Sequence, residues 1–98
     1  MSEVGPVAMD DRSSDFVLNV SIPRDPRFAE TVRELAVHAA RYAGCSEARA
    51  NAFGREVEEA TRRHIENGGG EVLVPLVFRR TTGPVEVLVN GRTLIAEP

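Results

Sequence analysis

One stretch of the chain, residues 46–70, has the pattern of a long amphipathic helix with a defined start and a defined end. Ser46 is placed to cap the first turn. Asn67 and the three glycines that follow end the helix, since glycine adopts the left-handed conformation of a C-terminal cap without a steric penalty. The apolar positions form one stripe at helical spacing: Phe53, Val57, Ala60 and His64. This stripe is the predicted buried face.

The opposite side of the same stretch carries charges of both signs, one helical turn apart. The i, i+4 spacing predicts three exposed ion pairs, which join Arg55 to Glu59, Glu58 to Arg62, and Glu59 to Arg63. Each pair stabilises a helix by roughly 0.3 kcal/mol. The charges therefore indicate an exposed helix face and do not by themselves indicate a site.

A strand and another helix are predicted upstream. Residues 15–22 alternate as a strand with one buried face does, and that face consists of Phe16, Leu18, Val20 and Ile22. Asp25 is the predicted N-cap of the helix, with Pro26 at its first position and Gly44 as its end. Its apolar stripe comprises Phe28, Val32, Leu35, Ala39 and Tyr42, widened by Ala36, Ala40 and Ala43. Gly54 costs the later helix about 1 kcal/mol relative to alanine, so we expect a close contact there with this helix or the sheet.

Three more strands are predicted after the glycines. Residues 71–80 place four apolar side chains on one face: Val72, Val74, Leu76 and Phe78. Pro75 cannot donate a main-chain hydrogen bond, which predicts a sheet edge or a bulge at that point. A turn at residues 81–83 leads to a strand with Val85, Val87 and Val89 on one face. Asn90-Gly91 predicts a two-residue hairpin turn into a last strand at residues 92–96.

These elements predict an α+β fold, a two-layer α/β sandwich in the order β-α-α-β-β-β. The two helices are expected to pack on one face of a mostly antiparallel sheet. Residues 1–14 are polar, acidic and interrupted by glycine and proline, which indicates a disordered N-terminal tail. Residues 15–98 form the single predicted domain.

Composition excludes several classes of partner. The net charge is −3, the pI is about 5.4, and all 12 basic residues are arginines, so no overall positive field draws the chain to nucleic acid or anionic lipid. No apolar run approaches the ~18 residues of a membrane span, and the first residues lack the features of a secretory signal. Cys45 is the only cysteine, which excludes an internal disulfide and favours a reducing, cytoplasmic location.

Few residues offer chemistry. Cys45 precedes a helix, where its pKa could be lowered, but a buried, unreactive thiol is the favoured interpretation. His38 and His64 have no partner at metal-ligand spacing, so structural or solvated roles are favoured and no metal site is predicted. The glycines at 68–70 end a helix and are not followed by lysine, which favours a cap over a phosphate loop.

One segment of the chain reads Val20-Ser21-Ile22-Pro23-Arg24-Asp25-Pro26-Arg27-Phe28. It is followed by a helix that ends Tyr42-Ala43-Gly44 and by a second helix that opens with Ser46-Glu47. Together these segments resemble the N-terminal half of the anti-sigma-factor serine kinases. That family belongs to the histidine-kinase-like (GHKL) ATPase superfamily. In it, the second helix carries a general-base Glu and, four residues later, an Asn that holds magnesium.

The matching run here is Val57-Glu58-Glu59-Ala60-Thr61-Arg62-Arg63. The resemblance places Glu59 at the general base and Arg63 at the magnesium ligand. A guanidinium has no lone pair for a cation, so this position departs from the family. The family's later nucleotide motifs follow the strands with which this sequence ends, and Asn90-Gly91 has no aspartate in register to replace them. The resemblance covers residues 16–89.

Three functions are compatible with these residues. The first, which we favour, is a non-catalytic regulatory domain that acts through protein contact, without metal or cofactor; the resemblance implies a sigma factor or an anti-sigma antagonist as partner, and a homodimer. Arg33, Arg41, Glu30 and Glu34 could rim such a surface. The second is a nucleotide-dependent serine kinase with Glu59 as the only candidate catalytic residue. The third is a structural subunit of a homo-oligomeric assembly.

Overall fold

The computed structural model describes residues 15–67, 72–80 and 83–97. Its elements are β1 (Phe16–Pro23), α1 (Phe28–Tyr42), α2 (Glu47–Asn67), β2 (Leu73–Arg80), β3 (Val85–Val89) and β4 (Arg92–Ala96). The predicted order is confirmed, and α2 ends at the predicted Asn67. The predicted disordered tail, the glycines at 68–70 and the threonines of the predicted turn at 81–83 lie outside the described residues.

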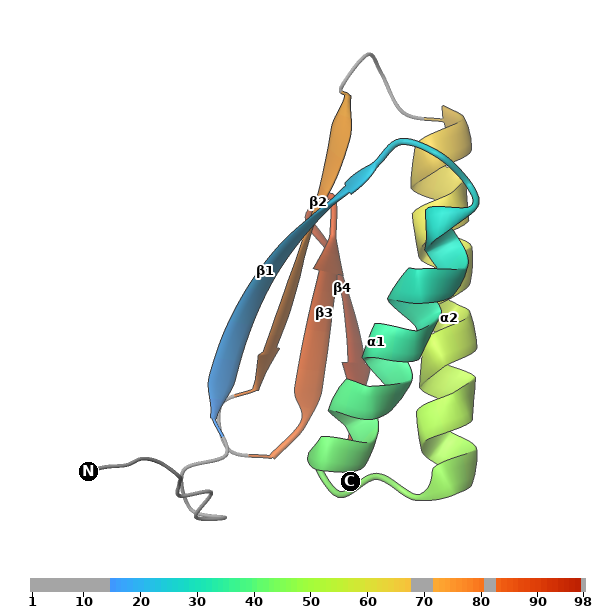
Figure 1. Ribbon diagram of the computed structural model, residues 1–98. Coiled ribbons are helices and arrows are strands. Elements are labelled where there is room, and N and C mark those ends of the chain that lie inside the picture. The colour runs from blue at the N-terminus through green and yellow to red at the C-terminus, as the bar shows by residue number, and fades with distance from the viewer. Residues whose placement is uncertain (1–14, 68–71, 81–82, 98) are drawn as a thin grey trace, which may run out of the picture.

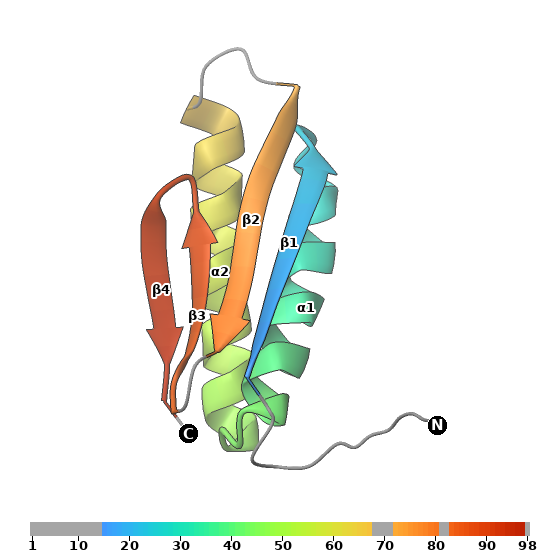
Figure 2. The ribbon, with the colours of Figure 1, turned by 90° about the vertical axis from the view of Figure 1, so that its left-hand side faces the viewer.

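The four strands form one sheet in the order β1-β2-β3-β4, and every neighbouring pair is antiparallel. Both helices lie on the same side of this sheet, as Figures 1 and 2 show. The predicted α+β two-layer sandwich is therefore confirmed. The path from β1 to its neighbour β2 runs through both helices, whereas β2, β3 and β4 follow one another through short connections. This order leaves β1 and β4 at the two edges.

The hairpin and the proline in β2 match their sequence signals. Asn90 and Gly91 have φ angles of 52° and 82°, the left-handed values that a two-residue hairpin turn requires. Pro75 lies opposite Ser21 of β1, but β3 stops pairing with β2 at Leu76. On its β3 side, β2 is thus a free edge at Pro75, and the predicted edge is confirmed. Val72 was wrongly predicted to be in the strand: it precedes β2 and is exposed.

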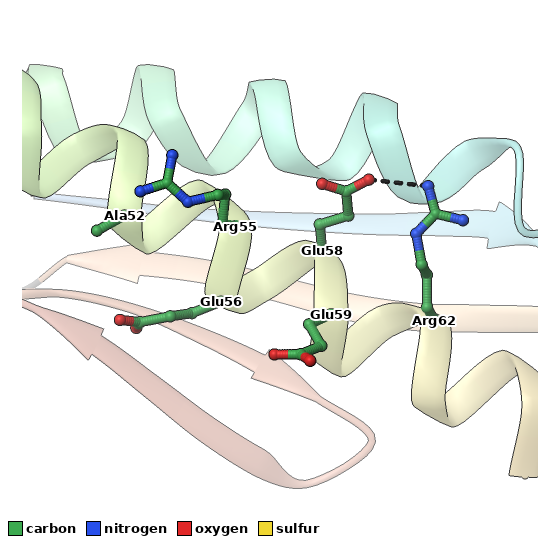
Figure 3. A pocket seen from close by; sticks show the side chains of 6 residues that line it. All are labelled: Ala52, Arg55, Glu56, Glu58, Glu59 and Arg62. Atoms are coloured by element: carbon green, nitrogen blue, oxygen red, sulfur yellow. Dashed lines mark hydrogen bonds and ion pairs between the residues drawn. The ribbon is translucent and has the colours of Figure 1, made fainter.

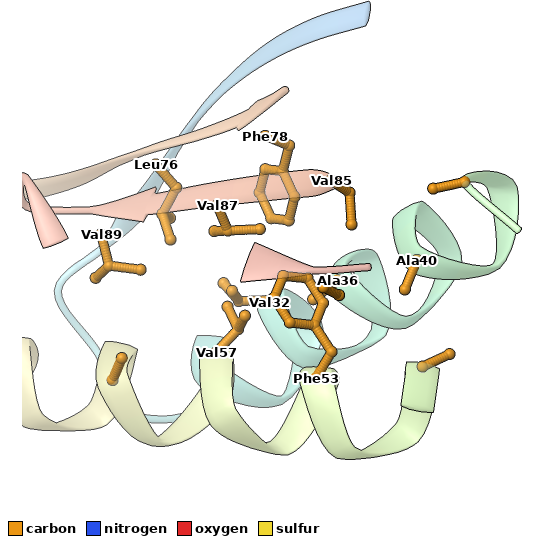
Figure 4. Packing of buried hydrophobic residues seen from close by; sticks show 14 of the residues in the cluster. Val32, Ala36, Ala40, Phe53, Val57, Leu76, Phe78, Val85, Val87 and Val89 are labelled. Atoms are coloured by element: carbon orange, nitrogen blue, oxygen red, sulfur yellow. The ribbon is translucent and has the colours of Figure 1, made fainter. Parts of the chain in front are cut away.

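The hydrophobic core lies between the helices and the sheet (Figure 4). Its largest fully buried apolar side chains are Phe53, Phe78, Leu76, Val32, Val57, Val74, Val85 and Val87. On α2 the predicted stripe is confirmed at Phe53, Val57 and Ala60, while His64 is only half-buried. Thr61 is also fully buried, and its hydroxyl donates a hydrogen bond of 2.8 Å to the carbonyl of Val57. The alternating apolar residues of the strands thus pack against the apolar stripe of α2 in one core layer.

The buried face of α1 is rotated from the predicted stripe. The fully buried residues are Ala29, Val32, Ala36 and Ala40, so the alanines that were expected to widen the stripe form its centre. Leu35 and Ala39 are half-buried, and Tyr42 is 52% exposed. Small side chains let α1 approach α2 and the sheet closely, and the larger apolar residues are left along its flank.

The start of α1 also differs from the prediction. The helix begins at Phe28, two residues later than expected, and Arg27 is its N-cap without a side-chain hydrogen bond. The Asp25 carboxylate instead accepts a hydrogen bond of 2.9 Å from the backbone N–H of Arg27 and pairs with its guanidinium. The hydrogen bonds from the Arg27 side chain and backbone lower the pKa of the Asp25 carboxyl. Asp25 therefore caps the turn that leads into α1.

The junction between the helices follows the predicted capping chemistry. Gly44 has a φ of 95°, and the N–H of Cys45 reaches back to the carbonyl of Ala40 at 3.0 Å, which closes α1 in a Schellman-type end. The Ser46 hydroxyl then accepts a hydrogen bond of 3.1 Å from the N–H of Arg49. Both the predicted end of α1 and the predicted cap of α2 are confirmed.

Gly54 lies where the two helices meet. A Cβ at this position would lie 2.4 Å from Cγ2 of Val37 and 3.1 Å from the carbonyl oxygen of Arg33, both on α1. Real Cβ atoms essentially never show the first of these distances. The predicted close contact with the first helix is confirmed.

Candidate functional site

Glu59, the one candidate catalytic residue, lies on the exposed side of α2. Its side chain is 67% exposed, and its carboxylate pairs with the Arg63 guanidinium at 3.3 Å, one turn further along the helix. This is the predicted i, i+4 pair. A carboxylate held in this way faces solvent and a cation, which gives it the chemistry of an ordinary surface ion pair.

The side chains around Glu59 diverge. They border a shallow, open hollow along α2 lined by Ala52, Arg55, Glu56, Glu58, Glu59 and Arg62. Figure 3 shows Arg55, Glu58 and Arg62 extending toward α1, whereas Glu56 and Glu59 extend toward the β3–β4 side. Glu58 pairs with Arg62 at 2.9 Å, as predicted. Catalytic groups act together when they point at the same reacting atom, and the side chains that line this hollow do not converge with Glu59 on one point (Figure 3).

Arg55 corrects one prediction. It was expected to pair with Glu59, but within the described part of the chain Arg55 forms no ion pair, because Glu59 is held by Arg63 and Arg55 extends toward α1 (Figure 3). Arg63 stands where the resemblance would require a magnesium ligand, and its guanidinium cannot serve as one. Glu59 and Arg63 are brought together, but as charge partners.

The remaining candidate residues are Cys45 and the two histidines. Cys45 is buried, and its thiol lies 3.4 Å from the carbonyl oxygen of Glu97, to which it can donate a weak hydrogen bond. Burial raises the pKa of this thiol above its ordinary value of 9.0, against smaller opposing effects of Arg49 and Arg80. This bears out the buried-thiol interpretation. His38 lies on the exposed flank of α1, and His64 is half-buried near the β3–β4 turn.

One surface was not predicted from sequence. Between β1 and α1 runs an apolar groove of about 420 Å³, lined by Phe16, Leu18, Leu35, His38, Ala39, Tyr42 and Phe78. Phe16 and Tyr42 contact each other edge to face, with ring centroids 5.8 Å apart. Leu18 remains 47% exposed although it points to the helix side of β1. The sequence signal for this groove was the number of large apolar residues on the predicted buried faces of residues 15–22 and of the first helix.

Comparison with known proteins adds no assignment. No family model, no curated protein and no solved structure matches this chain. Within residues 15–67, 72–80 and 83–97, no three His, Cys, Asp or Glu side chains are grouped so that they could hold a metal ion. Neither described helix is both long and apolar enough to cross a membrane. The resemblance to the anti-sigma-factor kinases stays a prediction.

Proposed function

We propose that this chain is a non-catalytic regulatory domain that acts in the cytoplasm through protein contact. The observation that carries the proposal is the apolar groove between β1 and α1, open beside an edge strand. Apolar side chains stabilise a fold when they are covered, and here Leu18 and Tyr42 remain about half exposed in one continuous groove. A partner that covers them gains the burial that the isolated chain lacks.

The strand beside the groove is open to pairing. β1 has eight residues, and none of those between Phe16 and Pro23 is charged. Edge strands commonly carry charges that prevent pairing with another chain, and β1 has none of them. The opposite edge differs: β4 is five residues long, carries Arg92, and one of its carbonyls, that of Ile95, accepts a hydrogen bond of 3.0 Å from Arg49 of α2. β1 is therefore the edge on which a partner strand fits.

A second copy of the chain is the partner that this edge fits. When β1 pairs antiparallel with itself about a two-fold axis, the side chains of its helix-facing side meet the same set on the copy. The two α1 helices then run antiparallel. Leu35, Ala39 and Tyr42, which line the groove on α1, then lie beside this contact, so the surface that the copy covers is mainly apolar. The resemblance implies a sigma factor or an anti-sigma antagonist as a further protein partner.

The kinase alternative requires magnesium and nucleotide beside Glu59. Arg63 places a positive charge 3.3 Å from that carboxylate, which opposes a second cation there. Calorimetric titration with ATP and magnesium, beside the Glu59→Ala variant, tests this alternative. We expect no binding at millimolar nucleotide. Magnesium-dependent binding that Glu59→Ala weakens would instead identify a nucleotide-using enzyme and reject the non-catalytic proposal.

Sedimentation velocity over a concentration series tests the contact at β1. We expect a monomer–dimer equilibrium for the wild type and a monomer for Leu18→Lys, because a lysine in the groove places a charge at the contact. Ile95→Lys is the matched control, since Ile95 is 45% exposed, close to the 47% of Leu18, and lies on the other edge. A wild type that stays monomeric up to millimolar concentration, or a Leu18→Lys variant that still dimerises, contradicts β1 pairing.

A further inference from the structure

The outer side of the seam between α1 and α2 holds a polar pocket that the interaction at β1 does not use. Its volume is about 390 Å³, and it is lined by Arg33, Glu34, Val37, His38, Arg41, Asn51 and Arg55. Three arginines thus line one hollow in a chain whose net charge is −3. One lining residue, Glu34, is acidic.

Close packing of α1 against α2 brings the arginines of the two helices to the same pocket. Because Gly54 has no side chain, the backbone of α2 approaches Val37 and Arg33 of α1 to within van der Waals contact. Arg33 and Arg41 reach over the seam from α1. Arg55 reaches it from α2, one residue beyond Gly54, and Figure 3 shows its guanidinium extending toward α1. Side chains from two helices therefore line the same hollow.

The charges of the three arginines are not equally compensated. Arg33 pairs with Glu30 at 3.3 Å and lies 3.6 Å from Glu58. Arg41 pairs with Glu47. Arg55 alone of the three has no ion pair within the described part of the chain, although Glu59 stands one turn away at a spacing that would allow one.

We propose that this seam binds a phosphate group, as the free dianion or on a small ester. A guanidinium carries five N–H donors and has no acceptor, so Arg33 keeps donors for an anion beside Glu30 and Glu58, and Arg41 keeps them beside Glu47. Arg55 supplies a guanidinium that no ion pair within the described residues holds, and Asn51, one turn before it, supplies a neutral amide donor. A phosphate offers three or more acceptor oxygens to side chains that come from two helices, whereas a carboxylate offers two. The pocket exceeds one phosphate in size, which leaves room for an ester group.

Phosphate titration followed by ¹H–¹⁵N NMR tests the proposal, with ionic strength held constant by sodium chloride. We expect saturable shifts in the backbone amides of residues 33–41 and 51–55 and in the Arg55 side chain. Arg55→Gln should weaken binding about tenfold or more, the loss of one charge-assisted hydrogen bond. Arg92→Gln is the matched control, because it removes one exposed positive charge outside the seam. It should bind phosphate as the wild type does.

The titration is repeated with ethyl phosphate, which stands for a phosphate ester, and with acetate, which stands for a carboxylate ligand. Ethyl phosphate that binds at least as tightly as inorganic phosphate assigns the site to an ester, and weaker binding of the ester assigns it to the free ion. Absence of shifts at the seam, equal weakening by Arg55→Gln and Arg92→Gln, or acetate binding as tightly as phosphate would overturn the proposal. Because Arg55 lies away from β1, Arg55→Gln should sediment as the wild type, so failure here is distinguishable from failure of the β1 contact.

Discussion

At the scale of single residues, Gly54 gives the sharpest expectation. In an exposed helix, Gly→Ala stabilises by about 1 kcal/mol, but a methyl group here would meet Val37 at 2.4 Å. Overpacking of this kind costs about 1–3 kcal/mol, so we expect Gly54→Ala to lower the free energy of unfolding. Urea denaturation measures the change.

The same contact supplies the control for Gly54→Ala. Val37→Ala removes the Cγ2 atom that a new methyl group would strike, while the carbonyl of Arg33 stays at 3.1 Å. In the Val37→Ala background, Gly54→Ala should therefore cost less than it does in the wild type, and the double-mutant cycle should show favourable coupling. A Gly54→Ala protein more stable than the wild type would contradict the contact.

Cys45 gives a prediction about pH. Burial raises the pKa of its thiol above 9.0, so the native state holds the proton more tightly than the unfolded state does. The stability that this contributes is fully present below the unfolded-state pKa and is lost as pH rises through the higher native pKa. The stability difference between the wild type and Cys45→Ala should thus shift against the wild type as the pH rises above about 9. Urea unfolding under reducing conditions measures it, and a constant difference would refute the buried thiol.

At the scale of elements, Arg24 joins the end of β1 to the end of α2. Its Nε and one Nη donate hydrogen bonds of 3.2 and 2.8 Å to the carbonyl of Ile65, in the last turn of α2. A cation at this end also complements the helix dipole. We expect Arg24→Ala to lower the free energy of unfolding by about 1–2 kcal/mol. Arg92→Ala, on an exposed strand, should change it little, and equal effects of the two substitutions would deny Arg24 this role.

How far the elements could be predicted depended on whether their signals were local. Ser46, Gly44 and Asn90-Gly91 act within a few residues of themselves, and the structure places each as its chemistry requires. The buried face of α1 is rotated from the predicted stripe because helical spacing fits more than one set of apolar positions, and close helix packing selected the set with alanines such as Ala36. Arg24 could not be placed beforehand, since its partner Ile65 is 41 residues away.

At the scale of the whole molecule, the sequence predicted the layers but not the order of the strands. Alternation identifies the face of β1 that turns toward the helices, and it carries no information on which strand β1 adjoins. The pairing of β1 with β2 makes β1 an edge and leaves Leu18 half exposed in the groove. The exposed pair of Glu59 with Arg63 was predicted from its i, i+4 spacing, whereas the groove that supports the proposed function was found only in the fold.

The sheet order also predicts how the molecule opens. β2 and β3 are paired on both sides, whereas β1 is paired on one side and borders the open groove, so its amides should exchange with solvent through local opening at the lowest free energy. If exchange requires the monomer, protection of β1 amides rises as dimer forms. Once the dimer dominates, a tenfold rise in protein concentration should slow their exchange about threefold, because the monomer fraction falls with the square root of concentration. Exchange at β4 should not respond, and Leu18→Lys should abolish the response at β1. Concentration-independent exchange at β1 in the wild type would show that this edge stays open in solution.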